Sequence, residues 1–254
     1  MYRVPPRVRG EIRRDLNGTG VEVTTATDEL RDLAEKASGE LADASAAEAL
    51  EWTARTFGDD WILASNMQDA VLIDLAVQAK PDFDVLFLQT GYHFPETIGL
   101  RDAVAATYSD ITIVNAMPDR TVAEQDAEEG PNLFERAPDR CCALRKVLPL
   151  RRTLANYDAW VTGVRRVDAP TRANTPIVQW DERNGLVKIN PIAPWTDEEF
   201  REYIDRNGIL ENLLVAEGYP SIGCAPCTAK VAPGADPRSG RWSGQSKTEC
   251  GLHG

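Results

Sequence analysis

Five cysteines are the residues of this chain with the most evident chemistry. Cys141 and Cys142 are adjacent, and Cys224 and Cys227 form Cys-Ala-Pro-Cys further along the chain. Four thiolates from two segments suit a tetrahedral zinc site or an iron–sulfur cluster. Adjacent cysteines reach one zinc ion only with a contorted backbone, whereas a cluster offers separate iron atoms, so a 4Fe-4S cluster fits better. Two alternatives stay open here, because CxxC also marks redox dithiols and adjacent cysteines are often buried apolar residues.

The fifth cysteine, Cys250, lies four residues before the end of the sequence, between Lys247 and His253. The thiolate is the reactive form of cysteine, and nearby cations lower the thiol pKa. Glu249 would act in the opposite sense. This arrangement suits a nucleophile that becomes activated when its segment folds over a basic site. The alternative is an incidental thiol on a tail.

Basic side chains gather in three places although the chain is acidic, with a formal net charge of -12. That charge argues against a nucleic-acid or anionic-membrane partner, because such surfaces are bound mainly through Lys and Arg. Arginine suits phosphate and sulfate oxygens, so one anionic pocket could collect these groups. Ordinary surface charge is the alternative for any single arginine. The groups are Arg145 and Lys146 after the cysteine pair, Arg165, Arg166 and Arg172 in TGVRRVDAPTR, and Arg238 and Arg241 in PRSGRW.

Alternating apolar segments predict the elements that must position these residues. Short apolar runs predict buried strands, and helical periodicity predicts helices between them. This alternation is typical of an α/β fold with a doubly wound, mostly parallel sheet and helices on both faces. The expected strands are 61–65, 84–89, 111–116 and 159–164, and the expected helices are 69–80, 95–107 and about 140–156.

Three polar loops follow the predicted strands. They are SNMQD (65–69), QTGYH (89–93) and TGVRR (162–166). Ligands of open α/β sheets bind at the carboxyl ends of strands, so these loops are the expected binding site. SNMQD precedes a predicted helix and could bind an anion through backbone N–H groups. It lacks the glycine richness of a phosphate cradle for ATP.

The remaining segments complete the expected organisation. Residues 1–26 are predicted to be a mobile N-terminal arm, 27–230 an α/β nucleotide-binding and iron–sulfur domain, and 231–254 a flexible tail that carries the catalytic cysteine. Two helices are expected before the sheet, the second opened by the Ser45–Glu48 capping box. A hairpin is expected over 176–190, turning at Asn184–Gly185, and a helix over 196–206. The sequence shows no membrane-length apolar run and no signal-peptide pattern, so we expect a cytoplasmic protein.

Several stretches together resemble one known family. CCALRKVLPL, TGVRR followed by APTR, NPIAPWTDEEFREYI, YPSIGCAPCT and KTECGLH are similar to the assimilatory adenylylsulfate (APS) reductases, the cluster-containing branch of the phosphoadenylylsulfate (PAPS) reductase family. The resemblance runs from about residue 45 to the end. It implies an adenine nucleotide α-hydrolase-like fold of the PP-loop type and a 4Fe-4S cluster on Cys141, Cys142, Cys224 and Cys227.

The resemblance also implies a reaction and a set of site residues. A thiolate matching Cys250 attacks the sulfate sulfur, expels AMP and leaves a cysteine S-sulfonate, from which thioredoxin releases sulfite. Cationic groups would offset the repulsion between these anions. The implied substrate-binding residues are Ser65, Asp69, Thr90, Gly91 and Gly163 around the adenylate, and Lys146, Arg165, Arg166, Arg172, Arg238, Arg241 and His253 around the phosphosulfate.

Two departures from related patterns bear on this resemblance. SNMQD keeps only the Ser and Asp of the SGGxDS loop of ATP pyrophosphatases, which argues against ATP cleavage. Gln89 stands where the family often has the Asp of LDTG. No thioredoxin-like segment follows Cys250, so we expect the electron donor to be a separate protein.

Other functions and the oligomeric state stay open, a homo-oligomer included. The nearest alternative is a PAPS reductase. An ATP-dependent tRNA-thiolating enzyme would need the missing glycines, and an iron–sulfur sensor would leave Cys250 and the arginines unexplained.

Overall fold

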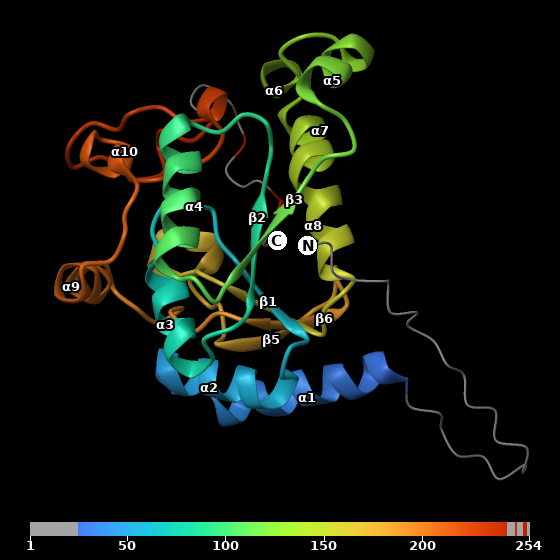
Figure 1. Cartoon of the computed structure of the whole chain (residues 1–254), viewed down its shortest axis with the longest axis vertical. Helices are drawn as coiled ribbons and strands as arrows, with labels where there is room; N and C mark the ends of the chain where they lie inside the picture. Colours follow the sequence, from blue (N-terminus) through green and yellow to red (C-terminus); the bar gives the residue numbers. More distant parts are fainter. Residues whose placement is uncertain (1–24, 243–246, 248–250, 253–254) are drawn as a thin grey trace, which may run out of the picture.

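Two capped helices precede the sheet in the computed structural model, which describes residues 25–242, 247 and 251–252. Helix α1 (Ala26–Glu40) begins after Thr25, and α2 (Ala46–Phe57) begins after Ser45. The side chain of Ser45 accepts from the backbone N–H of Glu48 while the Glu48 carboxylate accepts from that of Ser45, so the predicted capping box is confirmed. Both helices lie at one end of the molecule (Figure 1).

A six-stranded sheet forms the centre of the protein. Its strand order is β3-β2-β1-β4-β6-β5, and only the β5–β6 pair is antiparallel in the described part of the chain. The expected mostly parallel, doubly wound sheet is therefore confirmed, as is the hairpin, whose turn contains Gly185 at φ +68°. The strands are β1 (Trp61–Ala64), β2 (Asp84–Leu88), β3 (Thr112–Ala116), β4 (Ala159–Thr162), β5 (Val178–Asp181) and β6 (Leu186–Ile189).

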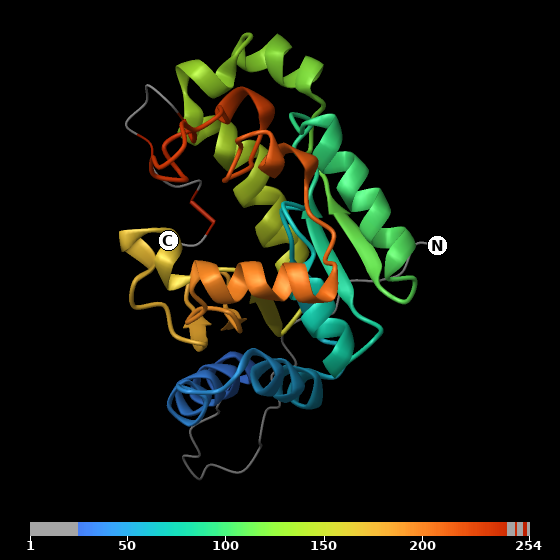
Figure 2. The same ribbon diagram turned by 90° about the vertical axis from the view of Figure 1, so that its left-hand side faces the viewer.

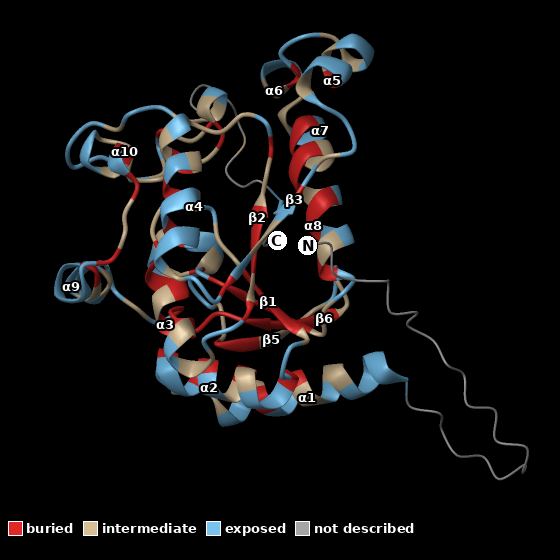
Figure 3. Cartoon of the chain, in the orientation of Figure 1, coloured by how far each residue is buried: buried red, intermediate tan, exposed pale blue. Residues whose placement is uncertain are grey.

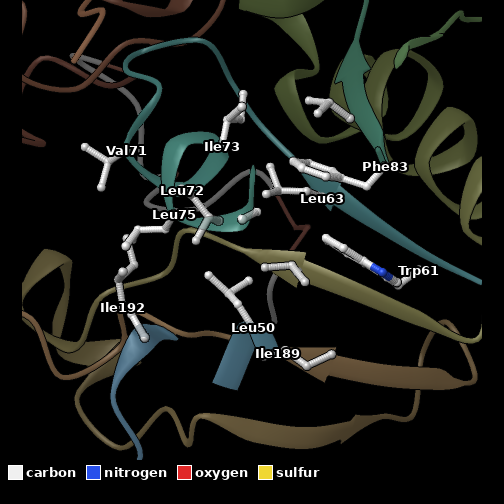
Figure 4. Close-up of a cluster of buried hydrophobic side chains, with 14 of the residues drawn as sticks. Leu50, Trp61, Leu63, Val71, Leu72, Ile73, Leu75, Phe83, Ile189 and Ile192 are labelled. Atoms are coloured by element: carbon white, nitrogen blue, oxygen red, sulfur yellow. The ribbon is translucent and has the colours of Figure 1, made fainter. Parts of the chain in front are cut away.

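Helices cover both faces of this sheet (Figures 1 and 2). One face packs against α1 and α2, α3 (Val71–Ala79), α4 (Pro95–Thr107) and α9 (Asp197–Asn207), where the larger apolar core lies (Figure 4). The other face packs against α8 (Leu148–Leu154) through a smaller core that includes Leu150 and Trp160. Helix α8 continues α7 (Pro138–Cys142) through a π turn, Ala143–Val147. The predicted helix over about 140–156 is thus three helical pieces in succession.

The prediction that every strand is buried is wrong for β3. Thr112 and Asn115 are exposed, and Ile113 and Val114 are only half-buried (Figure 3). The reason is that β3 is the edge strand of the sheet, so one of its long sides has no neighbouring strand. Several short elements were not predicted from the sequence. They are α5 (Val122–Glu129), α6 (Leu133–Arg136), α10 (Leu213–Ala216) and the 3-10 turns Arg166–Asp168, Pro170–Arg172 and Ala225–Cys227.

The segment expected to be flexible from residue 231 is exposed over 232–237, but near its end Gly240 and Trp242 pair with the 227–229 segment. The N–H of Ala229 donates to the carbonyl of Gly240 at 2.8 Å, and the N–H of Trp242 donates to that of Cys227 at 3.1 Å. A Cβ at Gly240 would lie 2.2 Å from the carbonyl oxygen of Ala229, so only glycine fits there. Trp242 is 3% exposed. The N-terminal arm up to residue 24, Cys250 and His253 lie outside the described residues, so the division into arm, domain and tail stays a prediction.

None of the described helices is both long enough and apolar enough to span a membrane.

Candidate active site

A cavity of about 710 Å³ lies at the carboxyl ends of three neighbouring strands. Ser65 follows β1, Thr90 follows β2 and Gly163 follows β4, and all three line it. The expectation that a ligand site lies at these strand ends agrees with the position of this cavity. Leu72, Leu86 and Trp160 give part of its wall an apolar surface suited to a flat base.

Most of the predicted substrate-binding residues meet in this cavity. Gly91 and Arg166 are not in its lining, and His253 lies outside the described residues. Leu252, two residues after Cys250, does line the cavity and packs against the smaller apolar core. The predicted residues in the lining are Ser65, Asp69, Thr90, Lys146, Gly163, Arg165, Arg172, Arg238 and Arg241.

Lys146 and Arg241 bring positive charge to one side of the cavity. Lys146 belongs to the π turn and is only 8% exposed. The guanidinium of Arg241 lies over the Trp242 ring at 4.6 Å, and its Nη1 donates to Ser221 Oγ and to the carbonyl of Ile222, each at 3.3 Å. A Cβ at Gly223 would lie 2.3 Å from Arg241 Nη2, so glycine is required for the guanidinium to pass. This side of the cavity suits an anionic group.

Arg165 has a different environment from Arg241. Its Nη2 lies 2.9 Å from carboxylate oxygens of both Asp168 and Asp197, and its guanidinium lies over the Phe200 ring at 4.6 Å. Two carboxylates therefore already offset its charge. Arg166 points elsewhere, because its Nε donates to the carbonyl of Thr175 at 2.9 Å. Arg165 thus holds the loop after β4 in place, besides lining the cavity.

Asp69 lies just before α3 and is partly buried in the wall of the larger cavity. Burial raises the pKa of Asp69 to about 6, and the repulsion from Glu211 adds to this, while the bond from the Val71 N–H, Arg165 and Arg201 act to lower it. Between about pH 4 and pH 6 the folded protein therefore binds a proton that the unfolded chain releases. Stability from this group is present at low pH and is lost as the pH rises through about 6.

Replacing Asp69 with asparagine should accordingly raise the free energy of unfolding at pH 8. The expected gain is about 1 to 3 kcal/mol, because burial disfavours the charged form, and it should vanish below about pH 4, where both side chains are neutral. Urea unfolding at pH 4 and pH 8 measures it, with the exposed Asp43→Asn as the control. A gain that does not change with pH would contradict the raised pKa.

The four paired cysteines converge on a second, small cavity of about 10 Å³. Cys141 and Cys142 end α7, Cys224 precedes the 3-10 turn Ala225–Cys227, and Cys227 ends that turn. Burial and the neighbouring thiols raise the pKa of Cys141 to about 12, and burial and Cys224 raise that of Cys227 to about 11. Among the described residues, no group of three His, Cys, Asp or Glu side chains is arranged to hold a single metal ion. The cluster on these four cysteines stays a prediction.

Arg145 lines the cysteine cavity, whereas the sequence indicated only that it belongs to a cluster of basic residues. It is 4% exposed, donates from Nε to the carbonyl of Thr90, and donates from Nη1 to Gln125 Oε1 at 3.1 Å. A Cβ at Gly91, where φ is +79°, would lie 3.0 Å from Arg145 Nη2. Gly91 therefore makes room for this arginine rather than lining the larger cavity. The π turn places two consecutive residues, Arg145 and Lys146, in the interior.

Thr90 connects the two cavities. It lines the larger one, and its Oγ1 accepts a hydrogen bond from Cys224 Sγ at 3.3 Å. Lys146 and Cys224 line both cavities as well. A bound anion and the cysteine group would therefore share a wall.

Two further residues line the larger cavity and were not predicted, although both lie in the predicted strand-end loops. His93 Nε2 lies 2.8 Å from the carbonyl oxygen of Leu88, its ring lies 4.7 Å from that of Phe87 at a tilt of 30°, and burial lowers its pKa. Gln68 lies between Asn66 and Asp69 in the loop after β1. The signal for His93 was its rarity, as one of two histidines in the chain.

The strand order reverses between β1 and β4, and the larger cavity lies at that point. This arrangement defines a PP-loop type of nucleotide-binding fold. An FMN adenylyltransferase from Candida glabrata shares this fold, with a TM-score of 0.51, 11% identity, and coverage of 80% of this chain and 74% of that one. A phosphoadenylyl-sulfate (PAPS) reductase from Candida auris is more similar, with a TM-score of 0.67, 28% identity, and coverage of 79% and 97%.

Sequence comparison identifies the family. The model of the phosphoadenosine phosphosulfate reductase domain matches residues 61–230. The adenosine 5′-phosphosulfate reductase of Mycolicibacterium smegmatis is 66% identical over 91% of this chain and 98% of its own length, and that of Streptomyces coelicolor is 57% identical over 93% and 100%. The chain belongs to the adenosine 5′-phosphosulfate reductases of the phosphoadenosine phosphosulfate reductase family.

Proposed function

We propose that this protein is an oxidoreductase that reduces adenylylsulfate to sulfite and AMP in sulfate assimilation. Its relatives at 57–66% identity carry the name of this activity. One observation on individual residues supports the proposal most. The two cavities share a wall, because Lys146 and Cys224 line both cavities. A nucleotide-sized cavity, cations for an anionic group and a set of thiols thus meet in one place.

The chemistry begins with Cys250 as the nucleophile. Its thiolate attacks the sulfate sulfur, the S–O bond to the phosphate breaks, and AMP leaves with that bond's electron pair. Lys146, Arg238 and Arg241 stand on the lining where they would offset the charge of the phosphosulfate and of the leaving phosphate. A dithiol donor of the thioredoxin type then attacks the S-sulfonate, is oxidised to a disulfide, and releases sulfite and the Cys250 thiol.

Cys141, Cys142, Cys224 and Cys227 are the residues that would hold a 4Fe-4S cluster. Their donor chemistry fits, because four thiols from two segments surround one cavity beside the buried cations Arg145 and Lys146. When bound, the cluster would supply a covalent tie between α7 and the 224–227 turn and a negative charge next to Lys146.

The assay that tests this function compares two substrates. Purified anaerobically and given thioredoxin, the protein should release sulfite from APS with a much higher kcat/KM than from PAPS. The reason is that the basic residues of the lining are assigned to the phosphosulfate, and none is assigned to an additional 3′-phosphate. Equal values for the two substrates would favour the PAPS reductase alternative, and no sulfite from either would refute the proposal.

Replacing Arg241 with alanine should lower kcat/KM for APS about 10- to 100-fold, the effect of losing a charge-assisted hydrogen bond to an anion. Steady-state sulfite release measures it. Arg183→Ala, on the exposed turn between β5 and β6, is the matched control and should leave the rate unchanged. An unchanged rate in the Arg241 variant would remove this residue from the site.

A further inference from the structure

The loop after β1 is bonded to the segment that leads to Cys224. Along the backbone, the N–H of Asn212 donates to the carbonyl of Gln68 at 2.9 Å, and the N–H of Ala70 donates to that of Leu210 at 3.0 Å. The side chain of Asn212 adds a bond to the carbonyl of Met67 at 3.1 Å. Segments about 145 residues apart in sequence are therefore held as one unit.

The side-chain amide of Gln68 extends this contact further along the chain. Its Nε2 donates to the carbonyl of Pro220 at 3.1 Å, and its Oε1 accepts from the N–H of Ile222 at 2.8 Å. One amide thus binds a donor and an acceptor two residues apart, as a neighbouring strand would. Gln68 also lines the larger cavity, so a ligand that orders this loop acts directly on the amide.

Ile222 is the point to which three side chains are attached. It is 2% exposed, its N–H is held by Gln68, and its carbonyl accepts from Asn66 Nδ2 at 3.4 Å and from Arg241 Nη1 at 3.3 Å. It stands two residues before Cys224. A shift of Ile222 would therefore move both the guanidinium of Arg241 and the first cysteine of the Cys-x-x-Cys pair.

We propose that Gln68 is a positioning residue that couples adenylate binding in the larger cavity to the placement of Arg241 and of the 222–227 segment. The inference deepens the proposed function and rests on it for the identity of the ligand. Adenylate restrains the loop after β1, and the Gln68 amide passes that restraint to Ile222. By linkage, ordering of the 222–227 segment strengthens adenylate binding by the same factor.

Amide hydrogen exchange of residues 219–228 tests this coupling on the whole protein, purified anaerobically, with and without AMP. Gln68→Met keeps the length of the side chain and removes both bonds, so exchange in this segment should become about tenfold faster, as expected for the loss of about one net hydrogen bond. AMP should slow the exchange in the wild type and not in Gln68→Met. Gln78→Met is the matched control, because its amide bonds Tyr203 and Asp74 on the outer side of α3. It should behave as the wild type does.

Gln68→Glu separates the two halves of the contact. Its carboxylate can still accept from the N–H of Ile222 but cannot donate to the carbonyl of Pro220, so AMP should still slow exchange at Ile222, to a smaller extent. In Gln68→Met, kcat for APS should fall about tenfold because Arg241 is misplaced, and the affinity for AMP should fall by the factor that the coupling contributes.

Full AMP protection of residues 219–228 in Gln68→Met would overturn the inference. A raised KM with an unchanged kcat would do so too, since it would make Gln68 a direct ligand. The exchange experiment needs no turnover, so its failure is distinguishable from the failure of the proposed activity, which the sulfite assay of the wild type reports.

Discussion

Mixed with APS and no reductant, the wild-type protein should release about one AMP per active site and then stop, whereas Cys250→Ser should release none. The S-sulfonate cannot turn over until a dithiol removes it, which explains the single burst. A serine hydroxyl is scarcely ionised near neutral pH, so sulfite formation by the variant should fall at least a thousandfold, in the range found when a nucleophile is removed. Rapid-quench measurement of AMP and mass spectrometry of the peptide containing Cys250 check both results.

The adduct and the colour distinguish this role from an incidental thiol. One SO₃ group should appear on the Cys250 peptide of the wild type. The Cys250→Ser variant should keep the brown colour of the proposed 4Fe-4S cluster and still bind APS. An adduct on Cys227, or sulfite made by the serine variant, would show that the nucleophile is a residue other than Cys250.

Replacing Cys142 with serine should remove the cluster and the activity together. The wild type should contain about four irons and four inorganic sulfides per chain, and the variant far fewer, because a neutral hydroxyl is a poor substitute for a thiolate ligand. Iron and sulfide analysis and visible absorbance measure this. Cys250→Ser is the control, since it also replaces one cysteine and should keep all four irons.

Two results would contradict the prediction for Cys142. They are a colourless wild-type protein with one zinc ion, or a Cys142 variant that retains its iron and its absorbance.

Much of the fold could be predicted because its signals are local. The Ser45 capping box, Pro95 at the start of α4 and the Asn184–Gly185 turn each specify a backbone conformation over a few residues, and the structure has all three. The burial of β3 could not be predicted in this way, since ITIVNA resembles a central strand and only the strand order makes it an edge. Helix α10 is a single turn whose cap, Asn212, is itself held by the loop after β1.

The site was predictable to the level of loops and less so to the level of side chains. The strand-end loops meet at the cavity because parallel strands present their carboxyl ends to one edge. The direction of each side chain depends on partners that are distant in sequence. Arg165 is paired with Asp197, Gly91 makes room for Arg145, and Gln68 binds Ile222 across more than 150 residues.

The π turn at Ala143–Val147 joins α7 to α8, so the number of residues between Cys142 and Leu148 sets the direction of the α7 side chains. Removing one residue within the turn would let the chain form a continuous α-helix, in which each residue advances the side-chain direction by about 100°. With α8 held by Leu150 and Leu154 in the smaller core, the whole rotation would fall on α7. Cys141 and Cys142 would then turn away from Cys224 and Cys227. Among related chains, insertions and deletions should therefore be tolerated in the α5–α6 region and excluded from 141–150, even where individual side chains there vary.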